Sequence, residues 1–158
     1  MIRRDQVDRI IRAASLATGR NDLVLVGSTS IFAHAKHIPA EMLQTNEVDL
    51  FSPDPSDVLR VREIIDGALG PASEFEQTFG AHGDAVDPAI IKLPRDWQER
   101  ASTYRTQFEG ITATVPALDD VAIAKMMAWR DKDKTWIKAG LRMGLISHDT
   151  MLCFGVQV

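Results

Sequence analysis

The chain is poor in cysteine and has no long hydrophobic run. Its single cysteine, Cys153, cannot form an intramolecular disulfide, which fits the reducing cytoplasm, and we expect its side chain in the core. Each apolar stretch meets a charged residue well short of the ~20 residues that a membrane-spanning helix needs. Residues 1–5 carry positive charge with no apolar segment behind them, unlike a secretory signal. We therefore expect a cytoplasmic protein with no membrane contact.

An excess of positive charge is also missing. The chain has 18 lysine and arginine residues against 22 aspartate and glutamate residues, a formal net charge of −4. Proteins that coat nucleic acid without sequence preference are basic, so this balance argues against that function. Local basic clusters remain, and the one in the first expected helix is either a solvated face or a basic surface near a phosphate site. Its members are Arg3, Arg4, Arg9 and Arg12.

The order of the expected elements predicts an α+β fold. A chain of 158 residues can bury roughly two-thirds of the surface of its unfolded form, so we expect residues 1–158 to form one domain. Apolar spacing predicts helices at residues 5–18, 28–35, 58–69, 117–130 and 133–143. Apolar or alternating runs predict strands at residues 23–26, 47–51, 81–87, 89–93, 103–108 and 111–115, the third and fourth being separate or one strand bent at Pro88. The result is a small mixed sheet packed with helices, and a helix pair ends the chain.

Two acidic residues lie one residue apart in the strand expected at 47–51. Side chains two positions apart on a strand point to the same face, so Glu47 and Asp49 project together. Neighbouring carboxylates repel each other unless a cation, a proton or an arginine lies between them. Oxygen ligands suit Mg²⁺, which completes its shell with water and substrate phosphates. Paired acids on an exposed strand face are also common without any metal, so this pattern alone does not identify a site.

A glycine turn follows the strand expected at 23–26. Gly27 allows backbone N–H groups to approach a phosphate closely, and the helix expected after it would offer its positive N-terminus to the same anion. Ser28 can donate a hydroxyl hydrogen bond to that phosphate, and we add Thr29 as a third candidate nucleotide contact. Many strand-to-helix turns need a glycine for structural reasons alone, so the turn gains weight only beside the acidic pair.

A third carboxylate would complete a metal site, and two candidates are close together. Alternation along the strand expected at 81–87 places His82 and Asp84 on one face. Asp84 and Asp87 cannot both face one metal without a bulge. We prefer Asp84, which is in the middle of the strand, whereas Asp87 precedes Pro88 and could serve a turn instead.

Lys125 shares the apolar stripe of the helix expected at 117–130. A buried ammonium group without a partner is very costly, so this lysine needs one. It either reaches the surface or pairs with Asp119 or Asp120, or else it contacts a triphosphate or one of the acids. Arg130 follows in the same part of the chain and is a further candidate for nucleotide binding.

Five motifs in this order resemble bacterial proteins of the nucleotidyltransferase superfamily, which has the DNA polymerase β-like fold. The motifs are Val26-Gly27-Ser28, Glu47-Val48-Asp49-Leu50, Phe79-Gly80, Leu93-Pro94-x-x-Trp97-x-x-Arg100 and Asp120-Val121-Ala122-x-x-Lys125 with Arg130-x-Lys132-Asp133. The resemblance extends to the transferases of abortive-infection and toxin–antitoxin systems. It covers nearly the whole chain, and the order and spacing are more specific than any single motif.

The resemblance implies a function and a set of site residues. Gly27 and Ser28 would hold the phosphates of a nucleoside triphosphate (NTP), and Glu47 and Asp49 would bind Mg²⁺ or Mn²⁺, with Asp84 or Asp87 as the third acid. The expected reaction is transfer of a nucleoside monophosphate (NMP) to RNA such as tRNA, to a protein or to a small molecule. A cognate toxin or antitoxin would be a partner. The alternative is a catalytically degenerate domain that serves as a binding or regulatory module.

Overall fold

The fold is α+β and is built on a five-stranded mixed sheet. The computed structural model describes residues 1–157, with side chains described for residues 1–153. The sheet order is β3-β2-β1-β5-β4. The strands are β1 (Val24–Val26), β2 (Glu47–Phe51), β3 (His82–Ala85), β4 (Ser102–Arg105) and β5 (Thr112–Val115). β1 runs antiparallel to β2 and parallel to β5, β2 runs parallel to β3, and β4 and β5 form an antiparallel hairpin.

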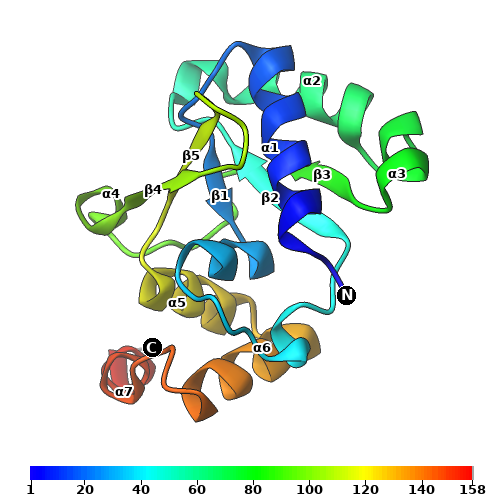
Figure 1. Cartoon of the computed structure of the whole chain (residues 1–158). Coiled ribbons are helices and arrows are strands. Elements are labelled where there is room, and N and C mark those ends of the chain that lie inside the picture. Colours follow the sequence, from blue (N-terminus) through cyan, green and yellow to red (C-terminus); the bar gives the residue numbers. More distant parts are fainter. Residues whose placement is uncertain (158) are drawn as a thin grey trace.

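Helices cover one face of this sheet and lie at one end of it (Figure 1). The α-helices are α1 (Arg4–Thr18), α2 (Val58–Leu69), α3 (Glu74–Phe79), α4 (Trp97–Arg100), α5 (Leu118–Ala128), α6 (Asp131–Arg142) and α7 (His148–Gln157). The 3-10 helices are η1 (Ser28–Ala33), η2 (Ala40–Met42) and η3 (Pro55–Asp57). Helices α1 and α2 cover the one face, and Figure 1 shows α1 lying across the front of the sheet, with α5, α6 and α7 gathered below it at one end. No helix in the described range is long and apolar enough to cross a membrane.

The main core lies between the sheet and the helices α1 and α2. The apolar stripe predicted for the first helix is buried here and meets Leu25, Val48 and Leu50 from the strands. Helix α1 ends at Gly19, whose φ of 74° lies in the left-handed region and whose N–H donates to the Ser15 carbonyl oxygen at 2.8 Å. Because Val48 and Leu50 point into this core, Glu47 must point to the opposite face.

The opposite face of the sheet has a smaller core. Phe51 packs there with Val24 and Val26, and partly buried side chains from residues 86–97 cover them. The strand predicted at 89–93 is wrong, because residues 88–91 form a turn in which the Asp87 carboxylate accepts the Ala89 N–H at 2.9 Å. The apolar residues of this segment serve to cover the sheet rather than to extend it.

Three helices were missed and one was predicted too long. Helices α3, α4 and α7 were not expected, and α7 continues the chain beyond the predicted final pair. Cys153 lies in α7 and is exposed, so its expected place in the core is wrong. The helix predicted at 28–35 is instead the shorter 3-10 helix η1.

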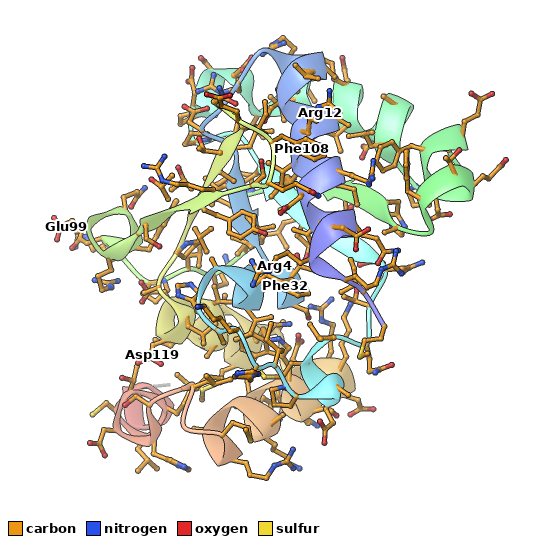
Figure 2. The ribbon with its side chains drawn as sticks, viewed as in Figure 1. Arg4, Arg12, Phe32, Glu99, Phe108 and Asp119 are labelled. Atoms are coloured by element: carbon orange, nitrogen blue, oxygen red, sulfur yellow. The ribbon has the colours of Figure 1, made fainter. Side chains whose placement is uncertain are left out.

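The arginines of α1 do not form a basic surface beside a phosphate site. Figure 2 shows Arg4 beside Phe32 and Arg12 beside Phe108, with guanidinium-to-ring distances of 5.2 and 4.7 Å. Helix α1 packs on the main-core face of the sheet, whereas Glu47 projects from the opposite face, so these cation–π contacts lie away from the acids. The first basic cluster therefore belongs to the outer surface of the main core.

Candidate functional site

The turn that ends β1 has a shape that requires glycine. Gly27 has a φ of 71°, and a Cβ added to it would overlap the carboxylate of Asp49. Ser30 fixes the turn, because its hydroxyl donates to the Gly27 carbonyl oxygen at 2.7 Å and its N–H donates to the same oxygen at 3.3 Å. The turn therefore brings the partly exposed backbone of Gly27 into contact with Asp49, one of the two acids of β2.

Three carboxylates meet on the face of the sheet that includes this turn. Glu47 and Asp49 both project from this face of β2, as the alternation predicted. The parallel register of β2 and β3 places Asp84 directly beside Asp49. One carboxylate oxygen from each of the three residues lies within 4.8 Å of the others. This spacing allows all three side chains to bind a common ion.

The electrostatics of the cluster favour a bound cation. The pKa of Asp49 is raised to about 7, first by burial and then by the charges of Asp84 and Glu47, while Lys125 and Lys132 act in the opposite direction. A carboxyl with this pKa is about half protonated at neutral pH. A divalent cation would replace the proton and relieve the repulsion among the three carboxylates. Because the ligands are all oxygens, hard ions of the Mg²⁺ or Mn²⁺ kind fit these residues.

Lys125 reaches from α5 to the glycine turn. Its Nζ atom donates to Ser28 Oγ at 3.0 Å and to Asp133 Oδ1 at 3.2 Å, and it lies 4.9 Å from the centre of the Trp136 ring. Burial lowers the pKa of Lys125, and the negative charge of Asp133 opposes that change. Since the lysine donates to Ser28, the serine hydroxyl hydrogen is free to donate to a ligand in front of the turn.

Among the alternatives considered for Lys125, the pairing with Asp119 or Asp120 is wrong. Asp120 accepts two hydrogen bonds from Arg100, at 2.8 and 3.2 Å. Asp119 accepts the Ser147 N–H at 3.0 Å and the Thr150 hydroxyl at 3.1 Å, at the start of α7. Both acids thus serve contacts between elements, and the partner of Lys125 comes from the next helix.

Asp133 joins two cations at the beginning of α6. It is fully buried and accepts hydrogen bonds from Arg130 Nε at 2.8 Å and from the Arg130 N–H at 3.0 Å, in addition to the bond from Lys125. Burial alone would raise the pKa of Asp133, but the bonds from Arg130 and the charge of Lys125 together lower it. Arg130 itself remains more than half exposed, and its free face is turned to the cleft.

These groups line one cleft with a volume of about 580 Å³. The three carboxylates, Gly27 and Ser28 lie along it. Its cationic lining residues are Arg62, Lys92, Lys125, Arg130 and Lys132. Its apolar lining includes Val86, Ile90, Ile91, Leu93, Val121 and Met127. The cleft therefore combines an acidic cluster, several cations and an apolar wall. These three surfaces suit the metal, the phosphates and the base of a metal-bound nucleotide.

Two candidate residues do not take the places expected of them: Thr29 lies outside the cleft, and Asp87 lies outside the carboxylate cluster. Thr29 is 1% exposed, and its hydroxyl is buried without a hydrogen-bond partner. Its side chain therefore does not line the cleft, and the expected contact of Thr29 with a nucleotide is wrong. Asp87 borders the cleft but is not part of the three-acid group, and its Oδ1 accepts the Ala89 N–H. Asp87 therefore has the turn role that we kept as its alternative, and Asp84 is the third acid of the cluster.

The sequence pointed to Asp133 only as a motif residue that follows Lys125 together with Arg130, and it did not predict that Asp133 pairs with Lys125. The signal was present, since the inward-facing Lys125 needed a partner and Asp133 lies eight residues further along the chain, in the first turn of the next helix. The angle between α5 and α6, which sequence periodicity does not give, decides the pairing.

A comparison with protein families gave a match that covers most of the chain. A family model described as "Nucleotidyltransferase of unknown function (DUF6036)" matches residues 5–153. No curated protein and no solved structure matched the chain.

Proposed function

The chain belongs to the family described as nucleotidyltransferases of unknown function, and we propose that it is an active, divalent-metal-dependent member of it. The proposed reaction transfers an NMP from an NTP to an acceptor and releases pyrophosphate. The observation that supports it best is the meeting of three carboxylates, a glycine turn and a buried lysine in one cleft. Mg²⁺ or Mn²⁺ is the metal that the carboxylate oxygens suit.

The three acids and the turn have separate roles in this proposal. Glu47, Asp49 and Asp84 hold the metal, which when bound neutralises phosphate charge and polarises the phosphorus that is attacked. The backbone of Gly27 and the hydroxyl of Ser28 donate to phosphate oxygens. The contact between Gly27 and Asp49 keeps the metal ligands and the phosphate donors in a fixed relation.

The cations of the cleft bind the triphosphate, and the apolar wall binds the base. Lys125 already touches Ser28, so a phosphate held by the serine lies within reach of the ammonium group. Arg130 is positioned by Asp133 and offers its free donors to the pyrophosphate that leaves. Apolar residues such as Val121 and Met127 suit the faces of a nucleobase.

The chemical step is an in-line displacement at the α-phosphorus. An acceptor oxygen forms a new bond to that phosphorus as the bond to the pyrophosphate oxygen breaks, and the pyrophosphate leaves with the electron pair of that bond. The acceptor proton passes to a carboxylate, for which we propose Asp84. Lys125 and Arg130 stabilise the negative charge that grows on the leaving group.

A second cavity beside the cleft gives the acceptor a place to bind. It has a volume of about 430 Å³ and shares Asp87, Ile91 and Leu93 with the cleft. Phe51 and Trp97 line it, with ring centres 6.2 Å apart in an edge-to-face arrangement. No lysine or arginine is among its lining residues in the described part of the chain. Among RNA such as tRNA, proteins and small molecules, this lining favours a protein side chain or a small molecule over a phosphate backbone.

The proposed cellular setting is the cytoplasm, in a toxin–antitoxin or abortive-infection system. In such a setting a second protein of the same system would bind this one and control the transfer. Co-purification of the chain with the product of a neighbouring gene would test that part of the proposal.

A transfer assay tests the proposed function. The protein is incubated with each labelled NTP, with Mg²⁺ or Mn²⁺, and with total RNA or a cell lysate as the source of acceptors. The test variant is Glu47→Gln/Asp49→Asn, and the matched control is Glu63→Gln/Asp66→Asn, which changes two exposed acids of α2 in the same way. We expect label transfer by the wild type and by the control, and none by the test variant.

The same assay separates the enzyme from a degenerate binding module. A module without chemistry would transfer no label in any condition, while NTP would still raise its unfolding temperature. If that shift were also unchanged in Glu47→Gln/Asp49→Asn, the acids would have no role in nucleotide binding and the proposed function would be wrong.

A further inference from the structure

The second cavity, which we assign to the acceptor, has one charged side chain among its described lining residues, the carboxylate of Asp87. Asp87 also borders the cleft that holds the three acids. Its Oδ1 atom accepts the Ala89 N–H at 2.9 Å, whereas its Oδ2 atom lies 3.8 Å from Arg62 Nη1, too far for a hydrogen bond. Arg62 lines the cleft and not the second cavity. One oxygen of the Asp87 carboxylate can therefore accept a hydrogen bond from a molecule in this cavity.

The lining of the second cavity offers few hydrogen-bond donors. Three of its residues are prolines, which have no N–H group: Pro53, Pro55 and Pro88. The N–H groups of Ala89 and Ile91 already donate to oxygens of Asp87, at 2.9 and 3.3 Å. The Ser52 hydroxyl donates to the Asp54 carbonyl oxygen at 3.4 Å. A molecule that brings its own donors therefore fits this lining better than one that brings only acceptors.

The helix end at this cavity is already capped by an acid. The 3-10 helix η3 leads directly into α2, and Pro55 and Val58 of these helices line the cavity. A helix N-terminus has positive character, but Asp54 caps this one by accepting the Ser56 N–H at 3.0 Å and the Ser56 hydroxyl at 2.7 Å. A carboxylate of the chain itself thus offsets the attraction that this helix end would have for an anion.

Aromatic rings complete the lining of the second cavity. Phe51 is buried, whereas Trp97 is only partly buried and packs edge-to-face against it. An aromatic ring attracts a cation through its face, and tryptophan does so most strongly. The Trp97 indole and the Gln98 amide also contain N–H donors, and both groups are neutral. The electrostatic character of the cavity is therefore set by Asp87 and the rings, which favour a positive charge.

We propose that the acceptor carries an ammonium group, which binds in the second cavity against Asp87 and Trp97 while the nucleophilic oxygen of the acceptor lies at Asp84. The inference rests on the proposed function and adds to it the charge of the acceptor. An ammonium group donates hydrogen bonds and accepts none, which suits the free oxygen of Asp87 and the scarcity of donors in the lining. A lysine side chain of a protein and the amine of a small molecule present this same group, and the test distinguishes the two sources.

Nuclear magnetic resonance titrations without NTP measure the binding of the ammonium group itself. The probes are N-acetyl-lysine amide for the protein source and an aliphatic amino alcohol for the small-molecule source. Each is compared with a neutral counterpart, N-acetyl-norleucine amide and the corresponding diol. The indole N–H signal of Trp97, identified by its loss in Trp97→Phe, reports on the cavity. We expect this signal to shift with the ammonium probes and much less with the neutral ones, and the ammonium probe that binds more tightly identifies the source.

Two substitutions change the charge beside the cavity in opposite directions. Asp87→Asn keeps an oxygen for the Ala89 N–H and removes the negative charge, so the ammonium probes should bind about tenfold more weakly. Arg62→Gln removes the cation that lies beside Asp87 and should strengthen their binding. Asp66→Asn, at an exposed position of α2, is the matched control and should leave the affinity unchanged. Equal shifts with charged and neutral probes overturn the inference, as do an unchanged affinity in Asp87→Asn and the absence of any shift at millimolar probe concentration.

The outcomes also separate this inference from the proposed function. If the wild type transfers label from an NTP to an acceptor while the ammonium probes leave the Trp97 signal unchanged, the transfer reaction stands and the cationic acceptor is wrong. If the ammonium probes bind as expected but no label passes to any acceptor, the cation-binding cavity stands and the proposed transfer is wrong.

Discussion

The carboxylate of Asp49 lies against the α-carbon of Gly27, so that one contact joins the acidic cluster to the turn that ends β1. Asp49 is paired with Val26 in the antiparallel register of β1 and β2, which sets its side chain beside the following residue. A metal held by Asp49 would therefore lie next to any phosphate held at Gly27. The predictions that follow depend on this contact and on the groups around it.

Gly27→Ala should abolish metal-dependent NTP binding. The added methyl group overlaps the Asp49 carboxylate, so either the acid or the turn must move. Gly19→Ala is the matched control, because Gly19 has a similar φ of 74° with no atom within 4 Å of the added Cβ. Alanine at Gly19 costs about 1–2 kcal/mol, because that residue is in the left-handed helical region with ψ of 18°. Gly27 combines its φ of 71° with a ψ of −161°, a conformation that glycine adopts almost alone, so the backbone cost there is larger, and only Gly27→Ala should lose the ligand. Equal NTP affinities in the two variants, measured by calorimetry, would contradict the shared role of Gly27 and Asp49.

Asp49→Asn should stabilise the metal-free protein at high pH. The folded-state pKa of Asp49 is raised from 3.8 to about 7, so the folded protein binds its proton more tightly than the unfolded chain does. The wild type is therefore most stable, with respect to this group, below about pH 4 and loses stability as pH rises to about 7. The whole shift corresponds to roughly 4 kcal/mol at most.

Denaturant unfolding without metal, at pH 4 and at pH 8, checks this prediction. The free-energy gain of Asp49→Asn should be largest at pH 8 and small at pH 4. Addition of Mg²⁺ or Mn²⁺ at pH 8 should stabilise the wild type and leave the variant unchanged. A variant that is less stable than the wild type at pH 8 without metal would show that the cluster is not strained by its own charge.

Lys125→Met should weaken both the fold and NTP binding, and a second substitution should separate the two effects. Loss of the ammonium leaves Asp133 buried with Arg130 as its remaining cation, so the cost is at most about 3–5 kcal/mol, the value for a buried charge with no partner. Lys125→Met/Asp133→Asn also removes the charge of Asp133 and should recover part of that stability without restoring NTP affinity. Lys138→Met, at an exposed position of α6, is the control and should change neither quantity. Recovery of NTP affinity in the double variant would argue against a phosphate contact by Lys125.

Trp97→Ala should impair transfer without impairing NTP binding. Trp97 packs on Phe51 in the second cavity and does not line the cleft that holds the acids. Trp97 is a partly buried aromatic ring, and removal of an aromatic contact of this kind costs about 1 kcal/mol, so the rate at limiting acceptor concentration should fall about fivefold. Transfer rates and NTP affinity are compared with those of Leu59→Ala, an exposed position on α2. A loss of NTP affinity in Trp97→Ala would place the ring in the nucleotide site instead of the acceptor site.

Local pattern was enough to predict the elements that carry the acids. The stripe of α1 and the alternation of β2 are strong signals, and both elements lie within a residue of their predicted bounds. Alternation also favoured Asp84 over Asp87, because an unbulged strand turns only one of them toward Glu47. The sequence was therefore sufficient to predict the face of each strand to which a side chain points.

The parts that were missed depend on packing between elements. The segment 89–93 is apolar because it covers Val24 and Phe51 on the second face of the sheet, and periodicity does not distinguish a covering loop from a strand. Asp133 is buried because α5 and α6 meet there. Such contacts follow from the fold and not from the spacing of residues along the chain.

The most direct test of the account is the effect of a divalent metal on nucleotide binding. The affinity for a non-hydrolysable NTP analogue is measured by calorimetry with Mg²⁺, with Mn²⁺ and with a chelator. We predict that either ion tightens binding by about tenfold or more in the wild type and in Glu63→Gln/Asp66→Asn, but not in Glu47→Gln/Asp49→Asn. Equal affinities with and without metal in all three proteins, or no binding by the wild type, would contradict a metal-bound nucleotide at these acids.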